Sequence, residues 1–525
     1  MTMTETQPAD AGEAGASSGQ ATRSSGLAAL LGSGDHLAIA RLWIVASFLF
    51  LVVAGVAGGL LGVERLDVSS LDLLDDTGSQ VFSLHAVGGI FLFLVPAFIG
   101  IATAVVPAQV GAATIAFPRA AAAAFWGWFL SSGVLIGSYF ADGGPGGGRP
   151  DAVLLWIVAF GGVLVALCLA SLCVVTTVLA LRTSGMTLDR VPAFSWSMLV
   201  AGSVWLLSLP VLLGLVILAY VDARYGGGLL GDGSPGFFSS LLRWAFLAPQ
   251  VFGYSVPALG LLLDAAPVAA KVRSRFHGVG LGAIAAAGVL GYGADMLLQG
   301  IDPSITTDFL YVVSAFAIAA PLLIVAGLTV DLLRRGTVRL TSPLLFGIAA
   351  LLMFLAGAAA GAMRAVEPLH LFGTSADASV VHYALFAGAL GAIGAMHHWA
   401  PVLFRVELRE NAGKAAAGLL LIGTVALALP DLFSGLLDQP TTLAYGNPRD
   451  GVELLNAVSL LGGLLVLVGV LVVLANLLSA RAASRKGDEP VTDPWDGQTL
   501  EWRVAGPLEP VASAQPLLDL KEAAS

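Results

Sequence analysis

Long apolar segments separated by short polar stretches dominate the chain. Segments of about 20 or more mostly apolar residues are long enough to cross a bilayer as a helix. They occur at 37–62, 80–106, 119–140, 152–181, 192–221, 241–269, 278–300, 308–333, 342–363, 379–404, 414–437 and 454–480. This pattern predicts an all-α integral membrane protein, with residues 35–482 forming a bundle of twelve transmembrane helices. Residues 1–34 are rich in Ala, Gly, Ser and Thr and predict a disordered cytoplasmic tail, while 483–525 predict a second, polar cytoplasmic tail.

Composition and charge agree with a membrane location. Hydrophobic residues make up 57% of the chain and charged residues 11%, whereas soluble domains carry about 25% charged residues. Lys and Arg gather in alternate loops, among them Arg334, Arg335 and Arg405, which predicts that both termini face the cytoplasm across the cell membrane. The net charge of -10 comes from acidic loops and tails and indicates no nucleic-acid partner. Cys168 and Cys173 share one apolar segment and are expected to be packing residues.

The apolar stretch from Phe82 to Phe117 contains one ionisable side chain, His85. An ionisable group inside a membrane span is costly unless a ligand or a partner receives it. His85 is therefore a candidate ligand. The alternative is a histidine near the membrane interface that bonds a neighbouring carbonyl group.

His382 is the second histidine that lies well inside a predicted span. Two imidazoles on separate helices of one bundle can hold a haem iron from both faces, which leaves no open position for a substrate. Gly89 and Gly388, each near one of these histidines, would let a flat macrocycle approach the backbone; they could equally serve close helix packing. His397 and His398 are expected at the cytoplasmic end of a span, where an imidazole reaches headgroups and water.

Several motifs then resemble subunit I of the haem-copper oxidases, in that family's order and near its spacing. The matching stretches are DHLAIARLW at 35–43, VVPAQVGAATIAFPR at 105–119, AFLAPQVF at 245–252, TSPLLF at 341–346, HYALFAG at 382–388 and DPWDGQTLEW at 493–502. The resemblance implies a twelve-helix bundle of the oxidase subunit I type. It also implies that His85 and His382 are the axial ligands of a low-spin haem.

The same resemblance indicates that the oxygen-reducing site is lost. Residues with no suitable donor stand where the family has its copper ligands, its cross-linked tyrosine and its high-spin haem ligand: Ala248, Phe252, Leu297, Leu298 and Val380. Hydrocarbon side chains have no lone pair for a metal. We therefore expect no copper in this chain.

The family's proton routes and propionate-binding arginines are altered as well. Gln250 stands at the position of the proton-donating glutamate, and Val325 at that of the channel lysine. Thr441 and Thr442 align with the paired arginines, which leaves Arg449 as a possible substitute. Asp295 is an added acid that could relay protons or hydrogen-bond a neighbouring group.

Three functions follow from the sequence. The first is a membrane cytochrome with one low-spin haem, which carries electrons in a respiratory chain from quinol or a cytochrome c to an acceptor, beside subunits of the oxidase II and III type. The second is a functional terminal oxidase with a rebuilt oxygen site. The third is a non-redox scaffold or assembly subunit.

Overall fold

The computed structural model describes residues 34–66, 74, 77–225, 251–291, 305–440, 450–484, 493–497 and 499–502, without side chains for 305–308, 310 and 484. Its long helices are α2 (His36–Glu64), α5 (Pro118–Phe140), α6 (Pro150–Ala180), α7 (Ala193–Tyr225), α13 (Ser342–Arg364), α14 (Ala376–His398), α16 (Glu410–Leu436) and α17 (Glu453–Ser484). Shorter helices are α3 (Gly78–Val87), α4 (Val95–Val110), α9 (Pro257–Ala270), α10 (His277–Leu290), α11 (Ile305–Ala317), α12 (Ala319–Arg335) and α15 (Ala400–Phe404). Single turns are η3 (Leu188–Arg190), η5 (Glu367–Leu369) and η7 (Leu500–Trp502), and η2 (Gly88–Leu94) is a π-helical segment.

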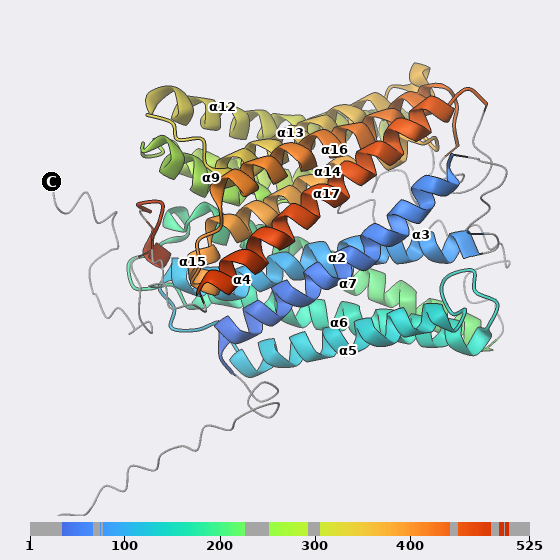
Figure 1. The fold of residues 1–525 in the computed structure, drawn as a ribbon, viewed down its shortest axis with the longest axis horizontal. Coiled ribbons are helices and arrows are strands. Elements are labelled where there is room, and N and C mark those ends of the chain that lie inside the picture. The colour runs from blue at the N-terminus through green and yellow to red at the C-terminus, as the bar shows by residue number, and fades with distance from the viewer. Residues whose placement is uncertain are drawn as a thin grey trace, which may run out of the picture. The chain divides into compact units, whose positions relative to one another are not determined.

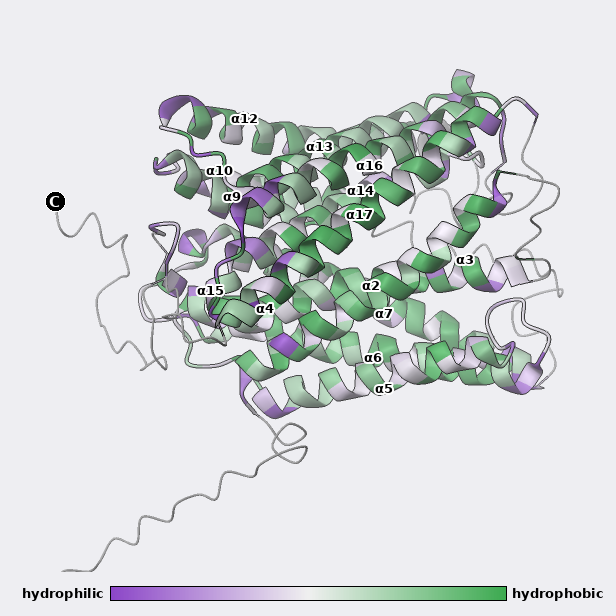
Figure 2. Cartoon of the chain, viewed as in Figure 1, coloured by the Kyte–Doolittle hydropathy of each residue, from purple (hydrophilic) through white to green (hydrophobic). Residues whose placement is uncertain are grey.

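The described part of the chain is helical and apolar enough to cross a membrane many times. Ten stretches meet the length and hydropathy of a span, and α9 and α10 are shorter apolar helices. These two correspond to the predicted spans 241–269 and 278–300, which extend into residues outside the described ranges. Figure 2 shows apolar residues along the length of the helices and polar residues mainly at their ends.

One continuous stretch, α3–η2–α4, forms the centre of the bundle. Around it the helices pack in sequence: α2 on α5, α5 on α6, α6 on α7, α7 on α9, α9 on α13, α13 on α14, α14 on α16, and α17 on both α16 and α2 (Figure 1). Nearly all of the apolar window between Gly78 and Val110 is buried, whereas only 28% of the window in α17 is buried. A π-helical turn such as η2 is rare and is often found at functional sites.

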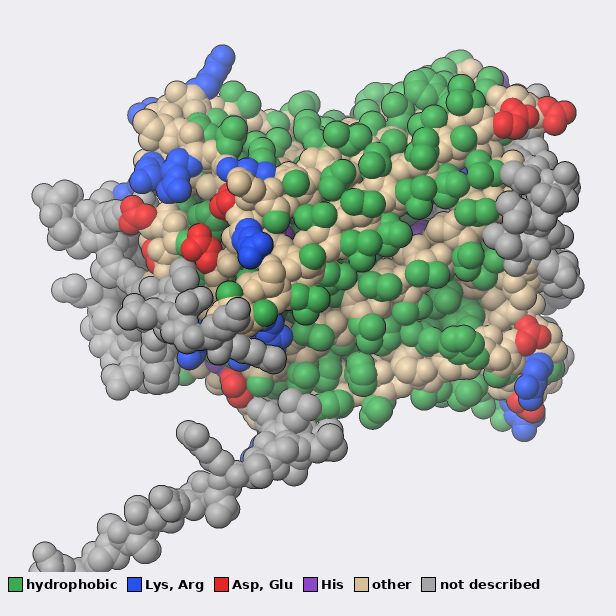
Figure 3. All heavy atoms as spheres, in the orientation of Figure 1, with side chains coloured by type: hydrophobic (Ala, Val, Ile, Leu, Met, Phe, Trp, Pro, Cys, Tyr) green, Lys and Arg blue, Asp and Glu red, His purple; other side chains and the backbone are tan. Residues whose placement is uncertain are grey.

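Side chains divide the surface into a belt and two ends. Hydrophobic side chains cover the face seen in Figure 3. Lys and Arg gather mainly at the end of the bundle where α9 and α12 finish. The pattern is that of a multi-pass membrane protein. Most of the predicted tails 1–34 and 483–525 lies outside the described residues, namely 1–33, 485–492, 498 and 503–525.

Candidate functional site

His85 lies at the end of α3 and packs against α2. Its Nδ1 is 2.9 Å from the carbonyl oxygen of Ala54. A methyl group built on Gly58 would lie 2.6 Å from Cε1 of His85, so only glycine leaves room for the ring there. This is the carbonyl bond that the sequence offered as the alternative to a ligand role; it uses Nδ1 and leaves Nε2 for a ligand, so the two roles are compatible.

His382 lies near the start of α14 and is 23% exposed although it is inside an apolar span. Its Nδ1 is 3.3 Å from Oδ2 of Asp431 in α16. α14 packs against both η2 and α4, and His382 is within electrostatic range of His85. The structure thus brings together the two histidines that the sequence selected.

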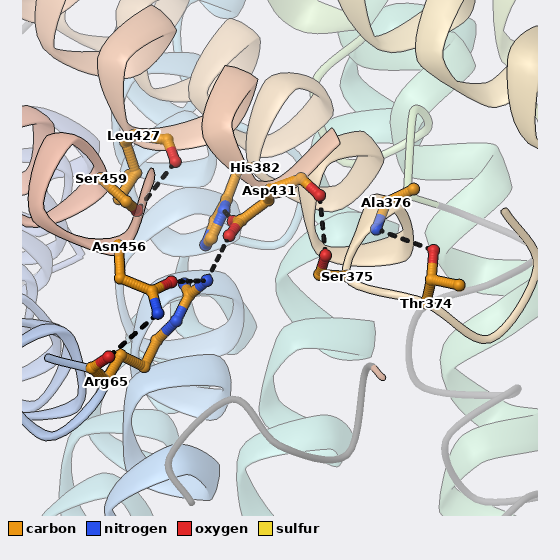
Figure 4. A network of polar contacts seen from close by, with 9 residues as sticks. All are labelled: Arg65, Thr374, Ser375, Ala376, His382, Leu427, Asp431, Asn456 and Ser459. Atoms are coloured by element: carbon orange, nitrogen blue, oxygen red, sulfur yellow. Dashed lines mark hydrogen bonds and ion pairs between the residues drawn. The ribbon is translucent and has the colours of Figure 1, made fainter. Parts of the chain in front are cut away.

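Asp431 is fully buried and joins three helices (Figure 4). Its Oδ1 accepts a hydrogen bond of 2.6 Å from Arg65, at the end of α2. Arg65 is held in turn by Asn456 of α17: the Arg65 guanidinium donates to Asn456 Oδ1 at 3.1 Å, and Asn456 Nδ2 donates to the Arg65 carbonyl at 3.0 Å. We call Arg65, His382, Asp431 and Asn456 the His382 network.

The sequence analysis missed this network, although one signal for it was available. Asp431 is a lone acid inside the predicted span 414–437, and the argument applied to His85 applies equally to it. Arg65 lies 366 residues from Asp431, so the pairing itself could not be read from local sequence.

The two histidines fit the requirements of a haem iron. A metal-binding histidine usually donates its second ring N–H to a carbonyl or a carboxylate, which fixes the tautomer and leaves the other nitrogen to the metal. His85 has Nδ1 hydrogen-bonded to a carbonyl oxygen in this way, and His382 has Nδ1 beside a carboxylate oxygen at 3.3 Å. A methyl group built on Gly89 would meet nothing within 4 Å, so there is open space beside His85. Gly388, in contrast, allows close packing on Ser255, which supports the packing alternative there.

Two of the residues expected at the lost oxygen site line one cavity. Phe252 and Val380 face a space of about 30 Å³ that Arg364 and Ser314 also line. Phe252 stacks on Phe354, and Val325 is fully buried. The hydrocarbon side chains of Phe252, Val325 and Val380 offer no lone pair to iron or copper, so they cannot bind either metal.

The other residues of the expected oxygen site, Ala248, Leu297 and Leu298, lie outside the described residues. So do the proton-route positions Gln250 and Asp295 and the propionate positions Thr441, Thr442 and Arg449. Among the residues that the structure describes, no cluster of three or more His, Cys, Asp or Glu side chains could hold a metal ion.

Comparison with known proteins supplies the family. The chain matches the family model for cytochrome c and quinol oxidase polypeptide I over residues 38–465. The chain belongs to this family. It is similar to cytochrome c oxidase subunit 1 of Bacillus subtilis, with 28% identity over 506 residues that cover 93% of this chain and 80% of the relative. A probable cytochrome c oxidase subunit 1-alpha of Streptomyces coelicolor is 26% identical over 525 residues, covering 93% and 88%.

A third relative, cytochrome c oxidase subunit 1 of Synechocystis sp., is 28% identical over 493 residues, which cover 90% of this chain and 88% of the relative. The chain is thus an oxidase subunit I-like membrane protein of the haem-copper oxidase family, whose members serve electron transport. The resemblance read from its motifs is confirmed.

The prediction for His397 and His398 is wrong in one respect. Both are buried, with 2% and 3% of their surface exposed, instead of reaching headgroups and water. The Nδ1 of His397 is 2.9 Å from the carbonyl oxygen of Ile393. The ring of His398 packs against Trp495 and Trp502. The chain segment that carries these tryptophans therefore covers this end of α14.

A second polar cluster lies beneath that segment. Gln109 of α4 donates to Oε1 of Glu501 at 2.9 Å and to Oδ2 of Asp264 at 3.1 Å, while its own oxygen accepts from Ser195 at 2.6 Å. Glu501 also accepts from Trp399 at 3.2 Å. We call Gln109, Ser195, Asp264, Trp399 and Glu501 the Glu501 network. Burial, with the nearby charge of Asp264, raises the pKa of Glu501 to about 7.

Proposed function

We propose that this chain is a membrane cytochrome that holds one low-spin haem between His85 and His382 and carries electrons without an oxygen-reducing copper site of its own. The observation behind the proposal is the pair of histidines: Nδ1 of His85 is hydrogen-bonded to Ala54, and Nδ1 of His382 lies 3.3 Å from the Asp431 carboxylate, so neither contact uses Nε2. When bound there, the haem would supply one-electron transfer. The protein's part is to hold both rings: Ala54 and Gly58 position His85, and Asp431 positions His382.

Within this proposal the bundle has twelve spans, with both termini in the cytoplasm. Quinol or a cytochrome c is the electron donor, and subunits of the oxidase II and III type are the partners in the cell membrane. Arg449 is the candidate for a haem propionate, and Gly89 for contact with the macrocycle. The relatives named above are oxidase subunits, so an oxidase with a rebuilt oxygen site remains the second candidate.

A haem and copper count on the purified chain tests the proposal. We expect one haem and no stoichiometric copper per chain, measured by pyridine haemochrome assay and elemental analysis. Two haems, or one copper per chain, would contradict the proposal in favour of the rebuilt oxidase. A haem-free chain would favour the non-redox scaffold.

Two neighbouring glycines of α2 provide a matched test of the site's location. In Gly58→Ala the new methyl group would push the His85 ring aside, because it would lie 2.6 Å from Cε1. In Gly59→Ala the methyl group meets nothing within 4 Å. We expect the first variant to lose most of its haem and the second to keep it. Equal haem content in the two variants would place the cofactor away from His85.

A further inference from the structure

The Nδ1 atoms of the two candidate axial ligands face different groups, a neutral carbonyl in one case and a carboxylate at 3.3 Å in the other. The Nδ1 of His85 faces a neutral carbonyl oxygen, that of Ala54. The Nδ1 of His382 faces a carboxylate oxygen, Oδ2 of Asp431. A carboxylate acceptor makes an imidazole ligand more basic than a carbonyl does, and a more basic ligand stabilises the higher oxidation state of the metal.

Two contacts hold Asp431 in this orientation, one to its carboxylate and one to its backbone. Arg65 binds the opposite oxygen, Oδ1, at 2.6 Å. Ser375 of α14 donates to the Asp431 carbonyl at 2.8 Å and so ties the backbone of α16 to the helix that carries His382. These contacts leave Oδ2 directed at the imidazole (Figure 4).

Arg65 is itself held in place. Asn456 accepts from its guanidinium and donates to its backbone carbonyl. The cation therefore stays on Oδ1 and does not compete for Oδ2. The arrangement compensates the buried negative charge without removing the oxygen that His382 uses.

We propose that Asp431 is a positioning residue that sets the redox potential of the site: it fixes the Nδ1–H tautomer of His382, makes His382 the more basic axial ligand and lowers the midpoint potential. This inference rests on the proposed haem function. Arg65 and Asn456 contribute by holding the Asp431 carboxylate in position.

Potentiometric titration of haem-loaded Asp431→Asn tests this role. The substitution keeps the shape of the side chain and removes its charge. At the wild-type midpoint we expect the ratio of reduced to oxidised haem to rise at least tenfold, about 59 mV for a one-electron couple. The ferric EPR spectrum should remain low-spin, with shifted g values, because both histidines are still present.

Asp377→Asn is the matched control. Asp377 is also on α14 and pairs with Arg364 at 3.1 Å, with 11% and 12% of the two side chains exposed. The Asp377→Asn variant loses the same charge from a similar ion pair but keeps Asp431 beside His382. We therefore expect a much smaller change in the midpoint potential. An equal change would show that net charge, and not the contact with His382, is responsible, and would overturn the inference.

Asp431→Asn leaves the Arg65 cation without its carboxylate, so a charge-balanced variant, Asp431→Asn with Arg65→Gln, provides a second measurement. We expect the same direction of change, since the negative charge that faces His382 is removed in both variants. Midpoints equal to wild type in both variants would overturn the role of Asp431 while leaving the haem itself in place. A wild-type chain without haem would overturn the proposed function as well, and the haem count separates the two cases.

Discussion

The His382 network and the Glu501 network lie near opposite ends of α14, about 26 Å apart at 1.5 Å per residue between residues 382 and 399. Each contains a buried acid, Asp431 in the first and Glu501 in the second, and each acid has contacts with neutral side chains. They differ in their cations. Arg65 pairs with Asp431, whereas among the described residues Asp264 and Glu501 are bonded by amide, hydroxyl, indole and backbone donors only, with no Lys or Arg in an ion pair.

This difference separates a fixed charge from a titratable one. A buried carboxylate with a cation partner stays charged in place, and it can act steadily on a neighbouring ligand. A buried carboxylate with neutral donors and a second acid beside it binds a proton more readily, as the raised pKa of Glu501 shows. One end of the bundle is suited to hold a ligand, and the other to respond to pH.

The largest expected effect separates the histidines at the two ends. Replacing His382 or His85 with Ala removes one axial bond and opens a coordination position, so we expect loss of the low-spin spectrum and of most of the haem. His398→Ala, at the other end, should keep the low-spin spectrum. Absorption spectra of the purified variants provide the measurement. If His397→Ala or His398→Ala lost the haem while His382→Ala kept it, the assignment of ligands on α14 would be wrong.

The second effect concerns the charge compensation of Asp431. Arg65→Gln leaves a fully buried carboxylate without its cation, which should lower the free energy of unfolding by about 4 kcal/mol. Thermal unfolding in detergent measures it. Asp331→Asn, which breaks the more exposed pair with Arg335 at 2.8 Å, is the control and should cost less than about 1 kcal/mol. Equal losses would remove the distinction between the two kinds of ion pair.

The third effect is a pH dependence confined to the Glu501 network. The pKa of Glu501 in the folded chain, about 7, lies above its ordinary value of 4.5. The folded state therefore binds the proton more tightly than the unfolded state. The stabilisation is complete below the ordinary value and is lost as the pH rises through about 7, with a total of about 3 kcal/mol.

Hydrogen exchange of residues 493–502 measures this effect, after correction for the intrinsic pH dependence of exchange. We expect their protection in the wild-type chain to fall between about pH 4.5 and pH 7, and that in Glu501→Gln to fall much less. A wild-type segment whose protection did not change over this range would contradict the account of this network.

Much of the fold could be predicted because span length is encoded locally. The segment predicted at 37–62 is helix His36–Glu64, and that at 454–480 is Glu453–Ser484. His85 and His382 could be selected because a lone ionisable group in an apolar run is conspicuous. Pairings that depend on tertiary contacts could not be predicted from the sequence: Asp431 and Arg65 meet only in the folded bundle.

The end of α14 shows the same limit. His397 and His398 were expected to reach water, whereas Trp495 and Trp502 pack over His398. All four are buried, because the segment from Asp493 to Trp502 folds back over this end of the bundle and its tryptophans pack on His398. Nothing in the local sequence of α14 indicates which distant segment covers it.

Carbon monoxide binding tests the central claim most directly, namely that His85 and His382 occupy both axial positions of one haem. Carbon monoxide needs a vacant position on ferrous iron. The account predicts that the absorption spectrum of the dithionite-reduced, purified chain is unchanged by carbon monoxide, and that His382→Ala, if it retains haem, acquires a carbon monoxide spectrum. A clear shift in the wild-type chain would contradict the account.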